Sequence, residues 1–287
     1  MESSTVQLRK SIQSKRRIVI KIGSSSLVHQ QTGDIDYVKL EKLVRFICDL
    51  RNQGKEIVLV SSGAIGIGAK VLGLRNRPIT VSLKQACAAV GQGQLMMIYQ
   101  KLFSEYQQTS AQVLLTFDVI TSDERRHNSI NTFNELLQLG VIPVVNENDT
   151  VATEEIEFGD NDTLSAVVAS LIKADMLVLM SDIDGLYTDD PRTNASASMI
   201  SEVEEITDEL RSMGKGAGSS LGTGGMATKI AAASIATDSG ADMAIINGNS
   251  IDNLSALFTG ENIGTIFKAH KNKNFNLLTY LKEKQYT

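Results

Sequence analysis

Residues 56–65 read EIVLVSSGAI, and this stretch sets the pattern that the rest of the chain repeats. The apolar run at 57–60 predicts a buried strand over 56–60, and Ser-Ser-Gly at its end opens a helix without a linker. Residues 17–25, RIVIKIGSS, begin in the same way, with an apolar run that ends in glycine and serines. Short strands that turn at once toward a helix are typical of an α/β protein with a parallel sheet.

Stretches with the pattern of a strand and stretches with the pattern of a helix continue to alternate along the chain. Further strands are expected at 112–116, 141–145, 175–181, 243–248 and 264–269, and residues 199–207 are expected to pair at a sheet edge. Helices are expected at 36–53, 82–105 (as one helix or two), 122–139, 162–174, 230–239 and 251–258. Residues 150–162 have the pattern of a short hairpin. The fold class predicted is α/β, with an open and mainly parallel central sheet.

Composition excludes several classes of protein. The length of 287 residues permits a full core, and the net charge of −5 argues against a nucleic-acid-binding surface. Two cysteines, Cys48 and Cys87, give no disulfide framework, so a reduced, cytoplasmic setting is expected. The three histidines are scattered, and no metal site on the protein is expected. The N-terminus has no apolar core typical of a signal peptide, and no apolar run is long enough to cross a membrane.

Polar clusters follow four of the expected strands. They lie at Gly23–Ser25, Ser61–Gly63, Asn146–Asp149 and Ser181–Asp182. Open α/β sheets bind their ligands beyond the carboxyl ends of the strands, so these clusters are candidates for one binding region. For Ser61–Gly63 a glycine turn with an N-capping serine is an alternative. Helix capping also explains one residue of Asp160–Asp162, but not all three.

Residues 216–229, GAGSSLGTGGMATK, form a glycine-rich stretch that leads into an expected helix. Backbone N–H groups and the helix dipole favour an anion there, and Lys229 adds a full positive charge. A Walker A loop is excluded, because Lys229 follows Thr228 rather than glycine. A flexible linker is the alternative. Lys21 is the second unusual cation, because a lysine within a buried strand needs a partner; it belongs either to an edge strand or to a phosphate site.

Six motifs together resemble the glutamate 5-kinases of the amino acid kinase family. In chain order they read VIKIGSS, VSSGAIGIG, VNENDTVAT, FGDNDTLSA, SDIDGLYTDDPR and GTGGMATK, and the match extends over residues 17–269. The resemblance implies a three-layer αβα sandwich. It also implies that ATP, with Mg²⁺, phosphorylates the γ-carboxylate of L-glutamate, which is the first step of L-proline biosynthesis. Proline is then expected to be a feedback inhibitor, and the protein is expected to be a homo-oligomer, either a dimer or a tetramer.

The resemblance assigns roles to individual residues. Lys21 and Lys229 are implied to bind the transferring phosphoryl group and the leaving side, with Asp162 holding both. The implied glutamate contacts are Ser62, Gly63, Asp149 and Asn161. The implied ATP contacts are Lys21, Ser181, Asp182, Thr223, Gly224, Gly225, Met226, Ala227, Thr228 and Lys229, and Mg²⁺ is expected to be held by ATP. Within the glutamate set, Asp149 is expected to accept from the α-ammonium, and Asn161 or nearby backbone amides to donate to the α-carboxylate.

Domain boundaries follow from the same resemblance. Residues 1–16 are an expected N-terminal extension, and 17–269 an expected kinase domain with a glutamate lobe at 17–174 and a nucleotide lobe at 175–269. Residues 270–287 are an expected tail, in place of the PUA domain that many bacterial members carry. Two alternatives remain open: another member of the fold, such as acetylglutamate kinase or aspartokinase, and a sensor that binds nucleotide without turnover.

Overall fold

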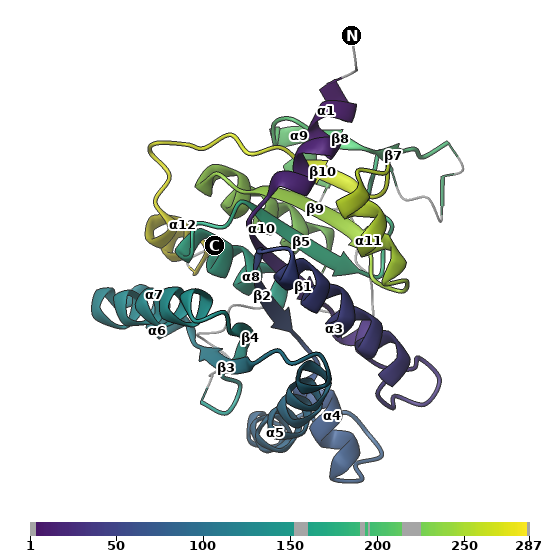
Figure 1. Cartoon of the computed structure of the whole chain (residues 1–287), viewed down its shortest axis with the longest axis vertical. Helices are drawn as coiled ribbons and strands as arrows, with labels where there is room; N and C mark the ends of the chain where they lie inside the picture. Colours follow the sequence, from purple (N-terminus) through teal and green to yellow (C-terminus); the bar gives the residue numbers. More distant parts are fainter. Residues whose placement is uncertain (1–3, 152–159, 190–192, 195, 214–224, 286–287) are drawn as a thin grey trace. The chain divides into compact units, whose positions relative to one another are not determined.

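The computed structural model describes residues 4–151, 160–189, 193–194, 196–213 and 225–285. An eight-stranded sheet has the strand order β3-β4-β2-β1-β5-β9-β10-β8 and is flanked by helices (Figure 1). Four of the strand pairings are parallel, and β10 is antiparallel to β9. The expected α/β class with a mainly parallel sheet is confirmed.

The strands are short and mostly buried. Their bounds are β1 Arg17–Ile22, β2 Glu56–Ser61, β3 Ser110–Leu115, β4 Ile142–Glu147, β5 Met176–Ser181, β8 Glu202–Val203, β9 Asp242–Asn247 and β10 Thr265–Phe267. All six residues of β5 are buried, as continuous apolar runs in parallel sheets require. β1 lies inside the strand order, so the edge-strand explanation of Lys21 is wrong. β8 occupies an edge, as expected for residues 199–207.

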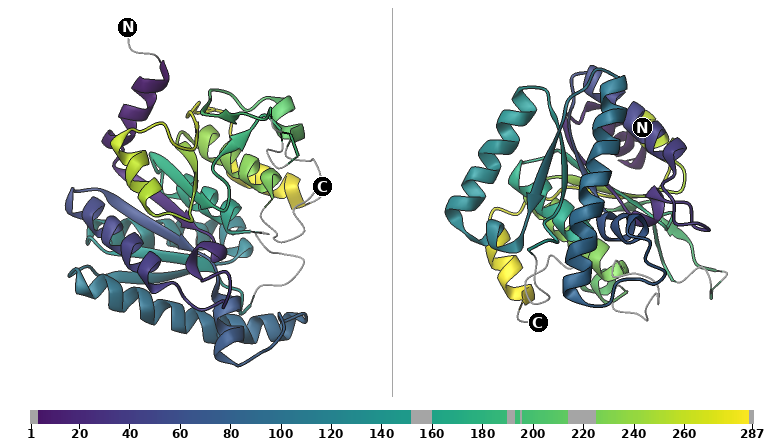
Figure 2. Two further views of the ribbon diagram at one scale, coloured as in Figure 1. Left: turned by 90° about the vertical axis from the view of Figure 1, so that its right-hand side faces the viewer. Right: turned by 90° about the horizontal axis from the view of Figure 1, so that it is seen from below.

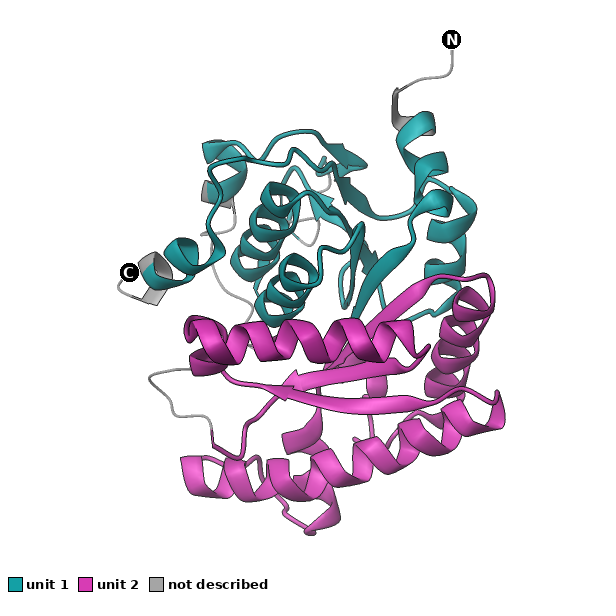
Figure 3. Ribbon diagram, turned by 60° about the vertical axis from the view of Figure 1, so that its left-hand side comes forward, with its two compact units in different colours: residues 1–21, 162–287 teal, residues 22–161 magenta. Residues whose placement is uncertain are grey.

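The chain divides into two compact units, residues 22–161 and residues 1–21 with 162–287 (Figure 3). The first unit contains β2, β3 and β4. Its helices are α2 Ser24–Leu27, α3 Tyr37–Asn52, α4 Ala64–Val71, α5 Val81–Glu105, α6 Phe117–Thr121 and α7 Asp123–Gln138. The lobes expected from the sequence are defined by their ligands, and that assignment stays a prediction.

Helix α5 is a single helix of 25 residues, seen at full length in Figure 2. Its two internal glycines do not interrupt it. Gly91 lies where α5 crosses α4, and a Cβ there would come within 1.8 Å of the Ala64 carbonyl oxygen. A Cβ on Gly68 of α4 would likewise come within 1.8 Å of the Cys87 carbonyl oxygen. The glycines therefore permit two helix backbones to touch.

The second unit contains β1, β5, β8, β9 and β10, and a separate antiparallel pair, β6 Leu186–Tyr187 with β7 Met199–Ile200. Its helices are α1 Ser4–Ser11, η1 Ile12–Ser14, α8 Asn161–Leu171, α9 Asp208–Met213, α10 Met226–Ser239, α11 Asp252–Thr259 and α12 Leu277–Gln285. α8 begins one residue before the unit boundary.

The N-terminal segment is anchored to this second unit. Arg9 of α1 is buried, and its guanidinium donates to the main-chain oxygens of Ser201, Glu261 and Ile263 at 2.8–2.9 Å. Ile12 is fully buried. Residues 9–12, expected to be part of an extension, are thus packed into the fold.

Candidate active site

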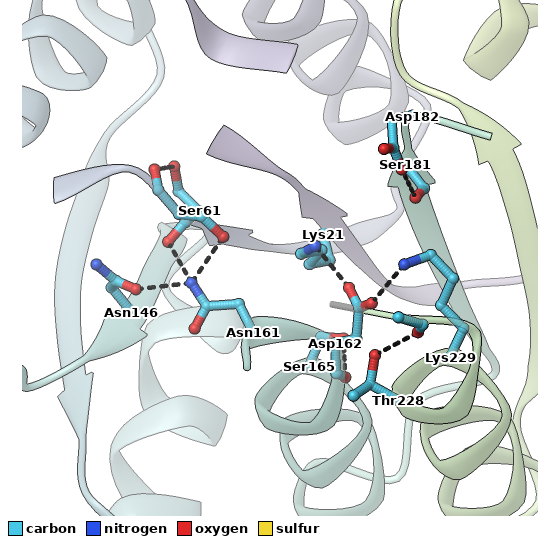
Figure 4. Close-up of polar contacts among 12 residues, drawn as sticks. Lys21, Ser61, Asn146, Asn161, Asp162, Ser165, Ser181, Asp182, Thr228 and Lys229 are labelled. Atoms are coloured by element: carbon cyan, nitrogen blue, oxygen red, sulfur yellow. Dashed lines mark hydrogen bonds and ion pairs between the residues drawn. The ribbon is translucent and has the colours of Figure 1, made fainter. Parts of the chain in front are cut away.

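Two lysines converge on one carboxylate within the unit formed by residues 1–21 and 162–287. Lys21 Nζ lies 2.5 Å from Asp162 Oδ1, and Lys229 Nζ lies 3.1 Å from Asp162 Oδ2 (Figure 4). Lys21 is on β1, Asp162 is in the first turn of α8, and Lys229 is in the first turn of α10. The structure therefore brings together the three residues implied to be catalytic, which are far apart in sequence.

The helix ends explain part of this arrangement. A carboxylate in the first turn of α8 is favoured by the helix dipole, whereas an ammonium in the first turn of α10 is not. The ion pair with Asp162 offsets that cost for Lys229. Gly225 is the N-cap of α10, and its carbonyl oxygen accepts from the Thr228 hydroxyl at 2.7 Å.

The three charged groups are almost removed from solvent. The exposed fractions are 9% for Lys21, 1% for Asp162 and 4% for Lys229. Burial alone would raise the pKa of Asp162, but the attraction of Lys21 and Lys229 outweighs it, so the pKa lies below its ordinary value. Two ammonium groups and one carboxylate sum to a charge of +1. A buried surplus of positive charge is suited to binding an anion such as a phosphoryl group.

The other residues implied to bind ATP are described in part. The Ser181 hydroxyl, at the end of β5, donates to the exposed Asp182 carboxylate at 3.0 Å. Met226, Ala227 and Thr228 form the first turn of α10 with Lys229. Thr223 and Gly224 lie outside the described residues, as do residues 216–222 of the glycine-rich stretch and residues 152–159 of the expected hairpin.

A second polar cluster lies in the unit formed by residues 22–161. Its centre is Asn161, whose Nδ2 donates to Ser62 Oγ at 2.8 Å, Asn146 Oδ1 at 2.9 Å and the Ser61 carbonyl oxygen at 3.2 Å (Figure 4). Asn146 in turn donates from Nδ2 to Gln92 Oε1 at 3.0 Å. The cluster joins the carboxyl ends of β2 and β4 to Asn161, the last residue of this unit.

Gly63 is the N-cap of α4, with φ of 100° and no side-chain capping bond. A left-handed backbone of this kind favours glycine, so the N-capping serine considered from the sequence is wrong. Ser62 accepts from Asn161 instead. Asp149 lies half-buried in the turn that follows β4.

The sequence argument missed two buried polar residues of α5. Gln92 reaches Asn146, and the Tyr99 hydroxyl lies 2.9 Å from Ser61 Oγ. Burial raises the pKa of Tyr99 far above its ordinary value, with a smaller opposing effect from the Ser61 hydrogen bond. The helical spacing of the sequence could have indicated that Gln92 is buried. Gln92 lies on the same face of α5 as Ala88, Leu95 and Tyr99, which are buried as well.

The sequence of this chain matches the model of one protein family over most of its length. That model, described as the amino acid kinase family, covers residues 16–247. The chain belongs to the amino acid kinase family. Membership makes it a kinase, and the cluster of Lys21, Asp162 and Lys229 gives this amino acid kinase a site suited to phosphoryl groups.

Curated relatives of this amino acid kinase carry a narrower name. The chain is 50% identical to "Glutamate 5-kinase" of Clostridium perfringens over 92% of its own length and 99% of that protein. It is 54% identical to the protein of that name from Clostridium acetobutylicum, covering 88% and 94% of the two chains. It is 52% identical to the protein of that name from Carboxydothermus hydrogenoformans, and the match covers 93% of this chain and 72% of that protein.

Solved structures share the fold at low sequence identity. UMP kinase from Ureaplasma parvum gives a TM-score of 0.62 at 17% identity, over 88% of this chain and 99% of that one. Isopentenyl phosphate kinase from T. acidophilum gives a TM-score of 0.59 at 17% identity, over 88% of this chain and 100% of that one. At these identities the likeness establishes the fold alone.

Among the described residues, no helix has the length and apolar character needed to span a membrane.

Proposed function

We propose that this amino acid kinase transfers the γ-phosphoryl group of ATP to the γ-carboxylate of L-glutamate, giving L-glutamyl 5-phosphate and ADP. The observation that carries the proposal is the buried Lys21–Asp162–Lys229 cluster, with its surplus positive charge. Identities of 50–54% to relatives named glutamate 5-kinase support the choice of substrate.

The proposed reaction requires stabilisation of negative charge and does not require a general base. A glutamate side chain has an ordinary pKa of about 4.3, so the attacking carboxylate is ionised at neutral pH. Its approach to the phosphates of ATP brings negative charges together. In the proposed reaction, Lys21 contacts the transferring phosphoryl group and Lys229 the leaving side, while Asp162 keeps both ammonium groups in place. The nucleotide further contacts Ser181, Asp182 and residues 223–229.

We propose that Mg²⁺ enters the site with ATP and neutralises charge on the phosphates. This ion prefers oxygen ligands and usually keeps several waters. The exposed Asp182 carboxylate and the Ser181 hydroxyl are oxygen donors of a suitable kind beside the proposed nucleotide site. These two residues fit an ion that is held mainly by substrate phosphates.

We propose that Ser62 and Asn161 of the second polar cluster bind glutamate together with Gly63 and Asp149, which lie in the same unit of residues 22–161. The half-buried Asp149 carboxylate is suited to the α-ammonium of a free amino acid. N-Acetylglutamate has no charged amine, and a carboxylate at that point would be unfavourable for it. This argument favours L-glutamate over N-acetylglutamate.

We further propose a cytoplasmic role in the first step of L-proline biosynthesis, with proline as a feedback inhibitor. The names of the relatives support the pathway. Proline carries an ammonium and an α-carboxylate, as glutamate does, and therefore offers the same charged groups to the site. Initial rates at fixed L-glutamate and rising L-proline test this, and unchanged rates would contradict it.

We also propose that the protein is a homo-oligomer. Leu83, Val90 and Met97 recur at seven-residue spacing on α5, and all three side chains are exposed. No charged residue lies between Lys84 and Lys101. An uncharged and partly apolar helix face of this kind supports packing against a second copy. Light scattering is expected to give the mass of a dimer or tetramer, and a monomer would contradict the proposal.

ADP release in a coupled assay tests the proposed activity. Wild-type protein with ATP and Mg²⁺ is expected to release ADP with L-glutamate, and much more slowly with N-acetylglutamate or L-aspartate. Turnover with N-acetylglutamate alone, or with L-aspartate alone, would show that the protein has another activity of the family. ATP binding without ADP release for any of the three would identify a non-catalytic sensor.

A further inference from the structure

One buried hydroxyl connects both strands of the β6–β7 pair to the eight-stranded sheet. Thr265, the first residue of β10, is fully buried. Its Oγ1 accepts from the Leu186 main-chain N–H at 2.7 Å and donates to the Ile200 carbonyl oxygen at 2.6 Å. Leu186 and Ile200 are partners in the antiparallel pair. The Thr265 side chain is therefore hydrogen-bonded to both strands of the smaller sheet.

Gly185 shows how closely the pair approaches Thr265. A Cβ on Gly185 would come within 2.7 Å of Thr265 Oγ1 and within 3.2 Å of the Thr265 main-chain nitrogen. The pair has only two residues in each strand. An isolated two-stranded pair is marginally stable at best, so β6 and β7 depend on contacts of this kind.

The N-terminal helix fixes the residues next to these hydrogen bonds. Arg9 Nη2 donates to the Ser201 carbonyl oxygen at 2.9 Å and to the Gly264 carbonyl oxygen at 3.2 Å. Ser201 follows Ile200 in the chain, and Gly264 precedes Thr265. The helix α1, which carries Arg9, lies beside β8 and β10 (Figure 1). A planar guanidinium offers its donors in a rigid fork, which suits a fixed set of carbonyl oxygens.

The strand β6 follows shortly after the residues proposed to contact ATP. Ser181 ends β5, and Asp182 comes next. Between them and β6, Asp184 accepts from Asn247 Nδ2 at 2.6 Å, at the end of β9. β5 and β9 are parallel neighbours, so these residues share the carboxyl edge of the sheet, where open α/β sheets bind their ligands. The placement of β6 therefore affects how Asp182 and Asp184 are held at this edge.

We propose that Thr265 and Arg9 are positioning residues for ATP. They hold the β6–β7 pair in place, and through it the segment that begins with Ser181 and Asp182. The inference rests on the proposed function. Apparent affinity falls with the fraction of molecules that keep the binding-competent arrangement. Loss of either anchor should therefore weaken ATP but not L-glutamate, whose proposed contacts belong to the unit of residues 22–161.

Thr265→Val removes the hydroxyl and keeps the shape of the side chain. Calorimetric titration with ATP and Mg²⁺ gives Kd, and ADP release at saturating ATP gives KM for L-glutamate. We expect Thr265→Val to raise the Kd for ATP by about threefold to thirtyfold, and to change the KM for L-glutamate by less than about twofold. Thr265→Ser keeps the hydroxyl and should bind ATP within about twofold of wild type.

Thr237→Val is the matched control. Thr237 is fully buried in the same unit, and its hydroxyl donates to the Ala233 carbonyl oxygen at 2.8 Å within α10. This control should bind ATP as the wild type does. Wild-type affinity for ATP in Thr265→Val would overturn the proposal. Equal weakening of ATP in Thr265→Val and Thr237→Val would also overturn it, because any buried hydroxyl would then have the same effect.

Arg9→Met tests the N-terminal helix and does not depend on the folding of Thr265→Val. It removes the hydrogen bonds of the guanidinium and keeps an apolar stem. We expect a higher Kd for ATP, an unchanged KM for L-glutamate, and faster hydrogen exchange in a peptide that covers residues 183–189. Wild-type affinity for ATP would refute the role of Arg9, whatever the exchange rate.

The wild-type protein separates this proposal from the proposed function. If it binds ATP but releases no ADP with L-glutamate, the proposed function is wrong, and the comparison of Kd values still decides the role of Thr265 and Arg9. If it does not bind ATP, both proposals are wrong.

Discussion

Replacing Asp162 by Asn perturbs the centre of the lysine cluster with almost no change in shape. The variant keeps the side-chain volume but removes the negative charge that lies 2.5 Å from Lys21 and 3.1 Å from Lys229. Both ammonium groups are nearly buried, so water replaces little of the lost interaction. The variant therefore removes the Asp162 carboxylate from two buried ammonium groups.

The size of the effect follows from these distances. Two unit charges about 3 Å apart attract by about 5 kcal/mol at an effective dielectric constant of about 20. Part of this gain is offset in the wild type by the cost of burying the carboxylate. Removing one partner of a buried ion pair typically costs about 3–5 kcal/mol, and we expect a loss of that size in the free energy of unfolding.

Urea unfolding followed by circular dichroism measures this loss, with Lys229→Met as the control. The control leaves the neutral pair of Lys21 and Asp162, so its loss should be clearly smaller. The pKa of Asp162 is lowered in the folded state, so its stabilising contribution is present above the unfolded pKa of about 3.9 and is lost as the pH falls through the folded pKa. The difference between wild type and Asp162→Asn should therefore be full at pH 7 and shrink below about pH 4. An Asp162→Asn variant within about 1 kcal/mol of wild type at pH 7 would refute the reasoning.

Three further predictions concern the two clusters and the helix crossing. Lys229→Ala should keep the fold and reduce kcat by about 10²–10³, as seen by steady-state ADP release; an unfolded variant would make the lysine structural. Asp149→Asn should raise KM for L-glutamate far more than KM for ATP, and equal effects would argue against its pairing with the amine. Gly68→Ala should lower the free energy of unfolding by about 1–3 kcal/mol or more, because its Cβ would meet the Cys87 carbonyl oxygen; unchanged urea unfolding would show that the helices separate freely.

The sequence alone predicted the fold class and most elements. Strand β5 is an apolar run up to its last residue, and β1 is an apolar run interrupted only by Lys21; such runs have few alternatives in a chain that also shows helical spacing. The convergence of Lys21, Asp162 and Lys229 came from the family resemblance. Local patterns carry no information about distances between residues more than 60 positions apart.

Other features depend on packing that no local pattern encodes. α5 was expected as one helix or two, because glycine usually weakens a helix; the structure shows that Gly91 is needed where α4 crosses. Gly63 has a left-handed backbone that a Ser-Ser-Gly turn does not specify by itself. The orientation of the Asn161 side-chain amide depends on its hydrogen bond to the Ser61 carbonyl oxygen, 100 positions away in the chain.

The most direct test of the account is to trap the product. An acyl phosphate reacts with hydroxylamine to give a hydroxamate, and mass spectrometry locates the modified carboxyl group. With ATP, Mg²⁺ and L-glutamate, the account predicts the γ-hydroxamate in equal amounts with ADP, and its loss in Lys229→Ala. ADP release without any hydroxamate, or a hydroxamate at the α-carboxyl group, would contradict transfer to the γ-carboxylate.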